Sequence, residues 1–560
     1  MKKLILFFLA LLLAGCSQEE VQPTVSDTAD LFTGRDYRTE YEEADCQVIT
    51  LGSGDVLINR EGSYLIRGTL EDGQIIVDAD KKEKIQLILD GVSVTSATSA
   101  PIYVRQADKV FITLVGDNTL ANGGSFEAID ENDIDAVIFS KEDLTLNGSG
   151  SLTISSPAGH GIVSKDELTI TGGTYDITCA SHGICGKDNL CIADGDFTIA
   201  AGKDGLHTEN NDDAALGFGY IEGGSFTISA EGDSIAASST LEIHGGTFDI
   251  TTGGGSENGT QQTSNGWGQM GGGRGPGMGG PGGMGFGGNT STDTEDSASI
   301  KGIKASGDLT ISGGTYTLNC ADDAIHSNAN MTIQVGDFTI ATGDDGFHAD
   351  DTLTIENGTV NISESYEGLE GLHIQVSGGD ISLISSDDGL NAAGGNDASG
   401  MGGRDQFGKP GGMGMGNSDG SIVISGGSIY MEASGDGIDA NGTLEITGGC
   451  TVVTGPTQGD TATLDYDVSA TISGGTFIGT GSSMMAQTFS ANSQGIIAVS
   501  LGGSAPAGTE LVLTDAAGGE VVRFTPNLSY AVVILSTPDM VSGERYTISV
   551  GTASAEFEAY

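Results

Sequence analysis

The sequence repeats one acidic phrase four times: Asp322-Asp323-Ala324-Ile325-His326, Asp344-Asp345-Gly346-Phe347-His348, Tyr366-Glu367-Gly368-Leu369-Glu370 and Asp387-Asp388-Gly389-Leu390-Asn391. The second acidic residue of each phrase lies at 323, 345, 367 and 388, in steps of 22, 22 and 21 residues. Between the phrases, apolar and polar residues alternate around a glycine corner at 309–318, 331–340 and 353–362. A unit this short cannot bury an apolar face alone and must stack on its neighbours. The stretch therefore predicts a parallel β-solenoid with about 22 residues per coil.

The same period organises most of the chain and predicts an all-β protein. We expect the solenoid over residues 46–490, with looser coils at its start. Right-handed winding is the prior for parallel crossovers. Two outsized steps between glycine corners contain Gly/Met-rich inserts at 252–299 and 393–418, whose composition predicts disordered loops. Residues 491–560 lack the phrase and alternate like a small antiparallel, sandwich-like β domain that caps the open end.

The charge of the chain limits its partners. The 77 acidic residues against 22 basic ones give a net charge of −55. Nucleic acid is excluded as an expected partner because binding it requires a basic surface. Such a charge implies either simple solvation or bound cations.

The first residues predict export and a lipid anchor. A basic start, Met1-Lys2-Lys3, precedes an apolar run at 4–13 and the sequence Leu13-Ala14-Gly15-Cys16. The run is too short for a permanent membrane span, and residues 1–16 read as a lipoprotein signal with lipidation at Cys16. The alternative is a chance cysteine after an ordinary signal peptide. Residues 17–45 are polar and aperiodic, which predicts a flexible tether. We therefore expect the protein outside the cytoplasm, at the cell surface and held to the membrane.

The remaining six cysteines show no zinc-type spacing such as C-x2-C. Cys179 and Cys320 occupy the same position several coils apart and cannot meet. We expect most of the cysteines to be buried free thiols. Tyr175, Tyr316 and Phe338, with Phe226 and Phe248, recur beside the glycine corner, which favours a packed stack over a sugar platform.

Aligning the coils places charged residues in one column: His160, His182, Asp204, Asp233, Lys301, Asp323, Asp345, Glu367, Asp388 and Asp436. Three residues further on, a second column contains His207, Lys304, His326, His348, Glu370, Asn391 and Asp439. Two carboxylates about 5 Å apart repel by roughly 3 kcal/mol at an effective dielectric near 20. The acids can share protons, pair with Lys301 and Lys304 one coil below, or hold Ca²⁺ between coils.

Of these three possibilities, bound calcium is favoured, because the column offers hard oxygen ligands and contains few basic residues. The candidate ligands are the eight acids of the four phrases: Asp322, Asp323, Asp344, Asp345, Glu367, Glu370, Asp387 and Asp388. The alternative is that each Asp caps a corner through its side chain, which explains one Asp per coil but not the doublets. His207, His326 and His348 share this face, either as transition-metal ligands or as corner histidines bonded to an Asp.

At these phrases and at Lys301-Gly302-Ile303-Lys304, the chain resembles a bacterial surface family of carbohydrate-binding, right-handed parallel β-helices similar in fold to pectate lyases. The resemblance covers roughly residues 45–560. It implies calcium held between coils by acidic side chains, and binding of plant cell-wall glycans such as cellulose and acidic pectic chains. It places the calcium role on Asp322, Asp323, Asp344, Asp345, Glu367, Asp387 and Asp388.

Three functions remain open from the sequence. The first is a non-catalytic, calcium-stabilised surface lipoprotein that binds a polysaccharide such as cellulose or polygalacturonate. The second is a polysaccharide lyase, in which Lys203, Lys301 or Lys304 would abstract the proton next to a uronate carboxylate and a cation would stabilise the resulting charge. The third is an adhesive stalk without glycan specificity.

Overall fold

The computed structural model describes residues 31–127, 129–259, 299–392, 420–457, 459 and 461–560. Regular structure in these residues is almost entirely β-strand, with two short 3-10 turns, η2 (Glu43–Asp45) and η3 (Ser256–Asn258). Within the same ranges, no helix is long and apolar enough to cross a membrane. The apolar run at 4–13 and Cys16 lie outside the described residues, so the predicted signal and anchor stay predictions.

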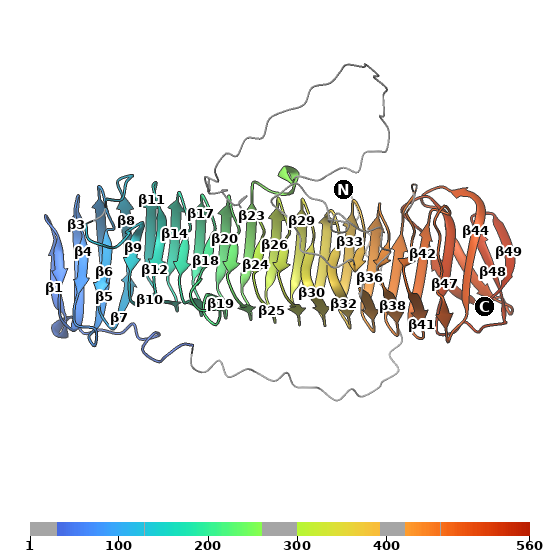
Figure 1. The fold of residues 1–560 in the computed structure, drawn as a ribbon, viewed down its shortest axis with the longest axis horizontal. Coiled ribbons are helices and arrows are strands. Elements are labelled where there is room, and N and C mark those ends of the chain that lie inside the picture. The colour runs from blue at the N-terminus through green and yellow to red at the C-terminus, as the bar shows by residue number, and fades with distance from the viewer. Residues whose placement is uncertain (1–30, 128, 260–298, 393–419, 458, 460) are drawn as a thin grey trace, which may run out of the picture.

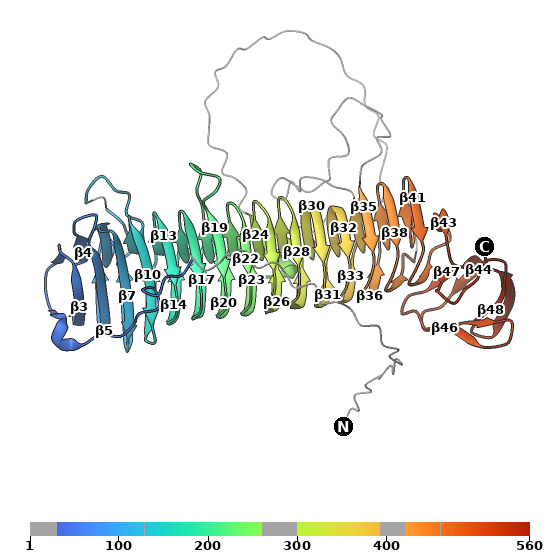
Figure 2. The same cartoon turned by 90° about the horizontal axis from the view of Figure 1, so that it is seen from below.

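The strands stack along the long axis of the molecule (Figures 1 and 2), and most belong to one large sheet system. Three rows of parallel strands run side by side along the stack, and the chain visits each row once per repeat. Row A contains β2 (Val56–Ile58), β4 (Ile75–Asp78), β6 (Ile102–Gln106), β9 (Ala136–Ser140), β12 (His160–Ser164), β15 (Ile184–Gly186), β18 (Leu206–Thr208), β21 (Ile235–Ala237), β24 (Ile303–Ala305), β27 (Ile325–Ser327), β34 (Leu390–Ala392), β37 (Ile438–Ala440) and β40 (Asp465–Tyr466).

Row B contains β1 (Gln47–Leu51), β7 (Lys109–Val115), β10 (Asp143–Gly148), β13 (Glu167–Ile170), β16 (Asn189–Ile192), β19 (Phe218–Ile221), β22 (Leu241–Ile243), β25 (Leu309–Ile311), β28 (Met331–Ile333), β35 (Ser421–Ile424), β38 (Thr443–Ile446), β41 (Ser469–Ile472) and β43 (Ala491–Asn492). Four longer strands bend around a corner and serve two rows: β3 (Gly62–Leu70), β5 (Lys84–Ser96), β30 (Phe347–Ile355) and β32 (Leu369–Val376).

Row C contains β8 (Asp117–Asn122), β11 (Ser151–Ser156), β14 (Thr174–Cys179), β17 (Asp196–Ala201), β20 (Ser225–Ala230), β23 (Thr247–Thr252), β26 (Thr315–Cys320), β29 (Asp337–Thr342), β31 (Thr359–Glu364), β33 (Asp380–Ser385), β36 (Ser428–Ala433), β39 (Cys450–Thr454) and β42 (Thr476–Gly481). The last strand of this row leads into the C-terminal sheets.

The pairing register reproduces the predicted period. In row A, Ile303 faces Ile325, which faces Phe347, Leu369 and then Leu390 in successive coils. These apolar residues point inward because side chains alternate faces along a strand. The topology is consistent with the predicted solenoid, and its handedness stays a prediction.

The glycine corner carries an inward column of rings, as the sequence indicates. Tyr175, Phe197, Phe226, Phe248, Tyr316 and Phe338 stack in successive coils with ring centroids 4.6–5.0 Å apart and interplanar angles of 1–9°. The strand spacing sets these distances. All six rings are buried, so they build core and do not form a sugar platform.

The stack continues across both predicted inserts. Ile235 of β21 pairs with Ile303 of β24, and Ile374 of β32 pairs with Ile422 of β35, as in coils without an insert. Residues 260–298 and 393–419 lie outside the described residues. The first insert begins later than the predicted residue 252, because residues 253–259 pack on the stack. Ser256 is buried, and its backbone N–H donates to Asn319 Oδ1 (2.8 Å).

Residues 31–45 differ from the predicted flexible tether and form an N-terminal strap along row B. Asp36 is almost fully buried, and its Oδ1 accepts a hydrogen bond from Thr145 Oγ1 (2.6 Å) and pairs with Lys109 Nζ (3.0 Å). The Phe32 ring lies 5.9 Å from the Tyr220 ring on β19. The strap docks because Asp36 finds polar partners that composition alone does not reveal.

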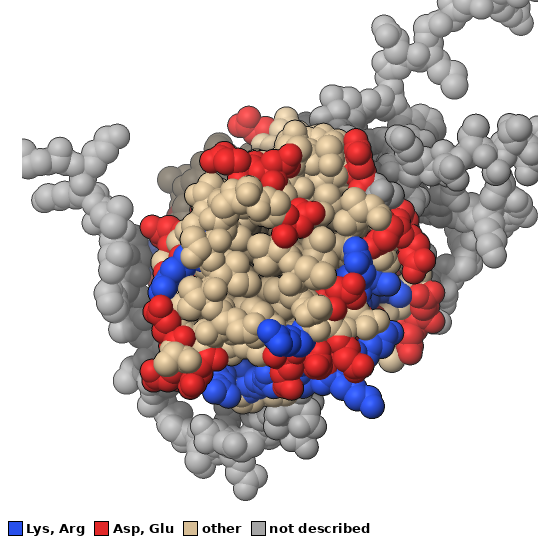
Figure 3. Space-filling model, turned by 90° about the vertical axis from the view of Figure 1, so that its left-hand side faces the viewer, with Lys and Arg blue, Asp and Glu red and all other residues tan. Residues whose placement is uncertain are grey.

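At the β1 end of the stack, Lys and Arg side chains gather along one edge while Asp and Glu occupy much of the remaining rim (Figure 3). There, Arg67 pairs with Glu43 of the strap (3.2 Å) and with Asp90 (2.7 Å). The six described cysteines are free thiols, and Cys179, Cys191 and Cys320 are buried, which agrees with the prediction for these three.

The other end of the stack is covered by antiparallel strands. β47 (Tyr530–Ser536) pairs antiparallel with β42 and with β44 (Ile496–Ala505), so it extends the main sheet. A second sheet has the order β46 (Glu520–Phe524), β45 (Leu511–Asp515), β48 (Arg545–Val550) and β49 (Ala553–Glu558). The two sheets share an apolar core that includes Leu513, Val533 and Ile548. The predicted antiparallel C-terminal region is thus present, and its first sheet is continuous with the stack.

Candidate functional site: the acid column

The predicted column follows one hydrogen-bonding rule. At most levels, the side chain accepts the backbone N–H of the column residue in the next coil; Lys301 has no acceptor atom, and the Asp323 N–H donates to Asp322 Oδ1 (2.9 Å) instead. Asp233 Oδ1 accepts from Lys301 N (2.7 Å), Asp323 Oδ1 from Asp345 N (3.1 Å), and Asp345 Oδ1 from Glu367 N (3.0 Å). The alternative interpretation of Asp as a corner-capping residue is therefore correct for this oxygen.

The second oxygen of three column aspartates faces a histidine three residues further on. His207 Nδ1 lies 2.7 Å from Asp204 Oδ2, His326 Nδ1 lies 2.8 Å from Asp323 Oδ2, and His348 Nδ1 lies 3.3 Å from Asp345 Oδ2. The two columns that the sequence places side by side are thus joined by Asp–His contacts within a coil.

Among the first three histidines of the face, His160 and His182 each accept the backbone N–H of the next column residue at Nδ1, whereas His207 is held by carboxylates. The rings of His160, His182 and His207 stack, with centroids 5.0 and 4.2 Å apart. His182 Nδ1 accepts the Asp204 backbone N–H (3.2 Å), so this nitrogen is already used. His207 bridges Asp204 and Glu209, and these carboxylates outweigh the effect of burial and raise the pKa of His207 to about 9. This part of the column is stabilised as a hydrogen-bonded ion pair.

Lys301 neutralises the next level. Its side chain is 3% exposed, and its Nζ lies 2.6 Å from Asp323 Oδ2 and 3.2 Å from Asp322 Oδ1, which is one of the three arrangements that the sequence left open. Burial alone raises the pKa of the Asp323 carboxyl, but the Lys301 charge and the His326 hydrogen bond hold it well below its ordinary value. Lys304 does not repeat this arrangement; its Nζ donates to Ser299 Oγ (3.1 Å).

The following two coils bury more acid than base. His348 Nδ1 lies 2.6 Å from Glu370 Oε2, and this contact outweighs burial and lowers the pKa of Glu370. Burial and the neighbouring carboxylates instead raise the pKa values of Asp345 and Glu367 well above their ordinary range. Glu367 Oε1 accepts from Asn391 Nδ2 (2.9 Å), while its Oε2 is buried without a hydrogen-bond partner.

Beyond Glu367, acidic side chains of the column lie close to one another, and little positive charge offsets their repulsion. Donor oxygens of Asp388, Asp436 and Asp439 lie within 4.8 Å of one another. Burial first, and then neighbouring carboxylates, raise the pKa values of these residues to about 9, 7 and 6 respectively. Asp436 and Asp439 are in the columns predicted from sequence, but the four-phrase repeat ends before them. The insert at 393–418 separates the phrase from its continuation, and the pairing of Leu390 with Ile438 confirms the alignment made across it.

The candidate metal ligands therefore fall into separate groups. Three of the predicted acids, Asp322, Asp323 and Asp344, offer oxygens within 4.8 Å of one another, and Asp345, His348 and Glu370 form another such group. Asp387 contacts Tyr366. Glu367 and Asp388 lie on successive levels of the column, because Leu369 and Leu390 pair. The eight predicted residues thus share one edge of the stack, but they do not form one site.

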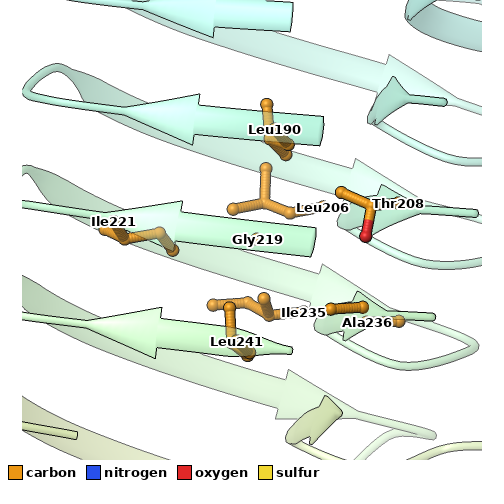
Figure 4. A pocket seen from close by; sticks show the side chains of 9 residues that line it. Leu190, Leu206, Thr208, Gly219, Ile221, Ile235, Ala236 and Leu241 are labelled. Atoms are coloured by element: carbon orange, nitrogen blue, oxygen red, sulfur yellow. The ribbon is translucent and has the colours of Figure 1, made fainter. Parts of the chain in front are cut away.

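The three predicted lysines do not converge on one position. Lys203 is exposed, two coils before Lys301 along the column. Lys301 is locked between two carboxylates, which favour its protonated form. A small internal gap beside this region is lined by Leu190, Leu206, Ile221, Ile235 and Leu241 (Figure 4), and these are core side chains. It offers no polar group for catalysis except Thr208.

The protein consists of stacked parallel strands with a buried column of acidic residues at one edge. The family described as carbohydrate-binding domain-containing protein matches residues 53–346, more than half of the chain, and the chain belongs to this family. A carbohydrate-binding domain-containing protein of Acetivibrio thermocellus is 36% identical over 185 residues, which cover 31% of this chain and 65% of that relative. Among solved structures, the polysaccharide lyase-like protein from C. thermocellum, as a gadolinium derivative, is 36% identical over 36% of this chain and 82% of that chain, with a TM-score of 0.35.

Proposed function

We propose that this protein is a surface-anchored, calcium-stabilised carbohydrate-binding protein, built as a right-handed parallel β-helix. Its polymer would be a plant cell-wall type of polysaccharide, cellulose or one like polygalacturonate. Family membership supports carbohydrate binding. The observation that carries the proposal further is the exposed face of row C, most of which lies within the residues matched by the family.

This face is polar and regular. From β8 to β29, the central outward position is threonine in six of eight strands: Thr119, Thr153, Thr198, Thr227, Thr317 and Thr339. The other two strands have Asp176 and Asp249 there. Short hydroxyl side chains at the strand spacing of about 4.8 Å offer hydrogen bonds at regular intervals to a polymer of hydroxylated rings. The face carries acids and no base among the described outward positions from 117 to 384. A neutral glycan therefore meets no repulsion, whereas a polyuronate needs a bridging cation.

Calcium fits the donor chemistry of the acid column. We propose the ligands among Asp322, Asp323, Asp344, Asp345, Glu367, Glu370, Asp387 and Asp388. The need for a cation is greatest from Glu367 onward, because Lys301 already neutralises the level of Asp322 and Asp323. The unpartnered Glu367 Oε2 and the acid-only group of Asp388, Asp436 and Asp439 support this placement. A bound Ca²⁺ would supply positive charge between coils and accept these oxygens as hard ligands.

The proposed location rests on the N-terminal sequence. Lipidation at Cys16 would attach the protein to the membrane outside the cytoplasm, where polymers in the surroundings are accessible. Lyase activity is the less supported alternative, because the lysine nearest the acid column is buried in two ion pairs. A stalk without glycan specificity is the outcome if no polymer is retained.

The test is retention of the full-length protein on insoluble cellulose and on polygalacturonate, in calcium and in chelator. Ultraviolet absorbance from unsaturated uronate is followed in the same samples. Retention without absorbance supports the proposal. Increasing absorbance makes the protein a lyase and directs attention to Lys203 and Lys304. No retention on either polymer, with the fold intact by circular dichroism, overturns carbohydrate binding for these polymers.

A further inference from the structure

Row C ends against the C-terminal strands (Figure 2), and its outward middle column changes character there. In the last coils this column carries Ser382, Tyr430, Val452 and Ile478, which pair in that order. Val452 and Ile478 pack into the core that the C-terminal sheets share. Tyr430 on β36 therefore lies at the boundary between the threonine-rich face and the C-terminal region.

Polar contacts hold the Tyr430 side chain at this boundary. Tyr430 and Glu432 point outward, because the residues that alternate with them along β36 belong to the core. The Tyr430 hydroxyl donates to Glu432 Oε1 (2.6 Å). Asn527 Nδ2, from the segment 525–529 that joins β46 to β47, donates to the same Oε1 (2.6 Å) and to the Tyr430 hydroxyl (3.0 Å). These bonds use Glu432 Oε1 and Asn527 Nδ2, so the other oxygen of each side chain remains available as an acceptor.

An exposed apolar side chain lies beside this polar cluster. Ile384 on β33 pairs with Glu432 in the next coil and is 46% exposed. The corresponding outward position in the strands from β8 to β29 carries Ala, Ser, Thr or Asn. Ile384 and the half-buried Tyr430 ring thus place apolar surface directly beside two hydrogen-bond acceptors.

We propose a binding subsite for one hexopyranose unit of a neutral polysaccharide, formed by Ile384, Tyr430, Glu432 and Asn527. This inference rests on the carbohydrate binding proposed above and narrows it to a neutral chain of the cellulose type. A pyranose ring has an apolar face of C–H groups and a rim of hydroxyls, so it fits a surface where an aromatic ring adjoins hydrogen-bonding groups. Tyr430 and Ile384 contact the apolar face of the sugar. Glu432 Oε2 and Asn527 Oδ1 accept its hydroxyl protons.

Charge and position select the polymer. Asp380 and Glu432 both lie on the outward side of row C near this end, and the described outward positions of the row from β8 to β36 carry no Lys or Arg. A uronate carboxylate is repelled here, whereas the hydroxyls of a neutral sugar donate to Glu432. Ser382 continues the middle column from the threonine-rich strands to Tyr430. A chain that lies along this face therefore places one of its units on the Tyr430 ring.

The test is calorimetric titration of the full-length protein with cellohexaose, in calcium, with an oligogalacturonate of equal length in parallel. Tyr430→Ala and Ile384→Asp should each weaken cellohexaose binding by about tenfold or more, because both remove apolar contact. Tyr430→Phe keeps the ring and should weaken binding by about threefold or less. Asn527→Ala should weaken it, whereas Asn211→Ala should not, although Asn211 is also an exposed amide that donates to a glutamate. Circular dichroism checks that each variant is folded.

Cellohexaose binding that Tyr430→Ala, Ile384→Asp and Asn527→Ala all leave unchanged overturns the subsite, while retention of the protein on cellulose leaves the proposed function in place. Absence of cellohexaose binding in the unchanged protein also overturns the subsite, and retention on polygalacturonate then still supports carbohydrate binding. If Tyr430→Ala weakens binding of the oligogalacturonate as much as that of cellohexaose, the choice of a neutral sugar is wrong.

Discussion

Replacing Lys301 by methionine tests how the acid column is neutralised. The change keeps a side chain of similar length but removes the ammonium that lies 2.6 Å from Asp323 and 3.2 Å from Asp322. Asp323 is fully buried and would lose its nearest positive charge. Removing one partner of a buried ion pair costs about 3–5 kcal/mol. The hydrogen bonds from His326 and from Asp345 N to Asp323 remain, so we expect the lower half of that range.

The free energy of unfolding is measured by urea denaturation in chelator, with Lys203→Met as the control. Lys203 is exposed, so its replacement should change stability by about 0.5 kcal/mol or less. Because contacts in a stacked repeat are mainly between neighbours, the loss should also appear as faster hydrogen exchange at Gly302 and Ile303, whose amides bond to residues 323 and 324.

Calcium provides the second arm of this experiment. If the ion can enter this level of the column, it should restore part of the free energy of unfolding that Lys301→Met loses. In Lys203→Met, calcium should change the free energy of unfolding by no more than it does in the unchanged protein. A loss below about 1 kcal/mol, with unchanged exchange at Gly302 and Ile303, would refute the conclusion that Lys301 neutralises the column.

Three further outcomes follow from other parts of the molecule. Phe226→Ala should lower the free energy of unfolding by about 3–5 kcal/mol because it opens a cavity in the ring stack, whereas Thr227→Ala on the exposed face should have little effect in the same denaturation experiment. Asp36→Ala should cost about 3 kcal/mol and expose residues 31–45 to limited proteolysis, because the buried pair with Lys109 is broken; equal cleavage rates would contradict docking of the strap. In chelator, thermal stability should fall as pH rises from about 4 to about 9. Acids with raised pKa values, such as Asp436 at about 7 and Asp388 at about 9, stay protonated in the folded state at pH values where the unfolded chain has already released the proton, so stability is lost until the pH passes the folded pKa. Asp436→Asn or added calcium should flatten this fall, and a slope unaffected by either would argue against the acid group as its source.

Much of the candidate site could be predicted from the sequence. The column from His160 to Asp436 follows directly from the repeat, and the pairing of Lys301 with Asp322 and Asp323 was one of three ways of neutralising the column that its place one coil below left open. The Asp–His contacts were one of two alternatives left open. What could not be predicted is which oxygen serves the backbone and which serves a side chain. That division depends on the orientation of each carboxylate at the corner.

The sequence by itself determined the period, the register and the inward ring column, because alternation along strands and glycine at corners are local properties repeated in every coil. Only the tertiary structure decided the individual partners. Asp36 meets Thr145 across 109 residues, and Ser256 reaches Glu364 across 108. Such contacts depend on which side chains the stacked coils bring within reach. No local pattern records them, so they emerge only when the chain is folded.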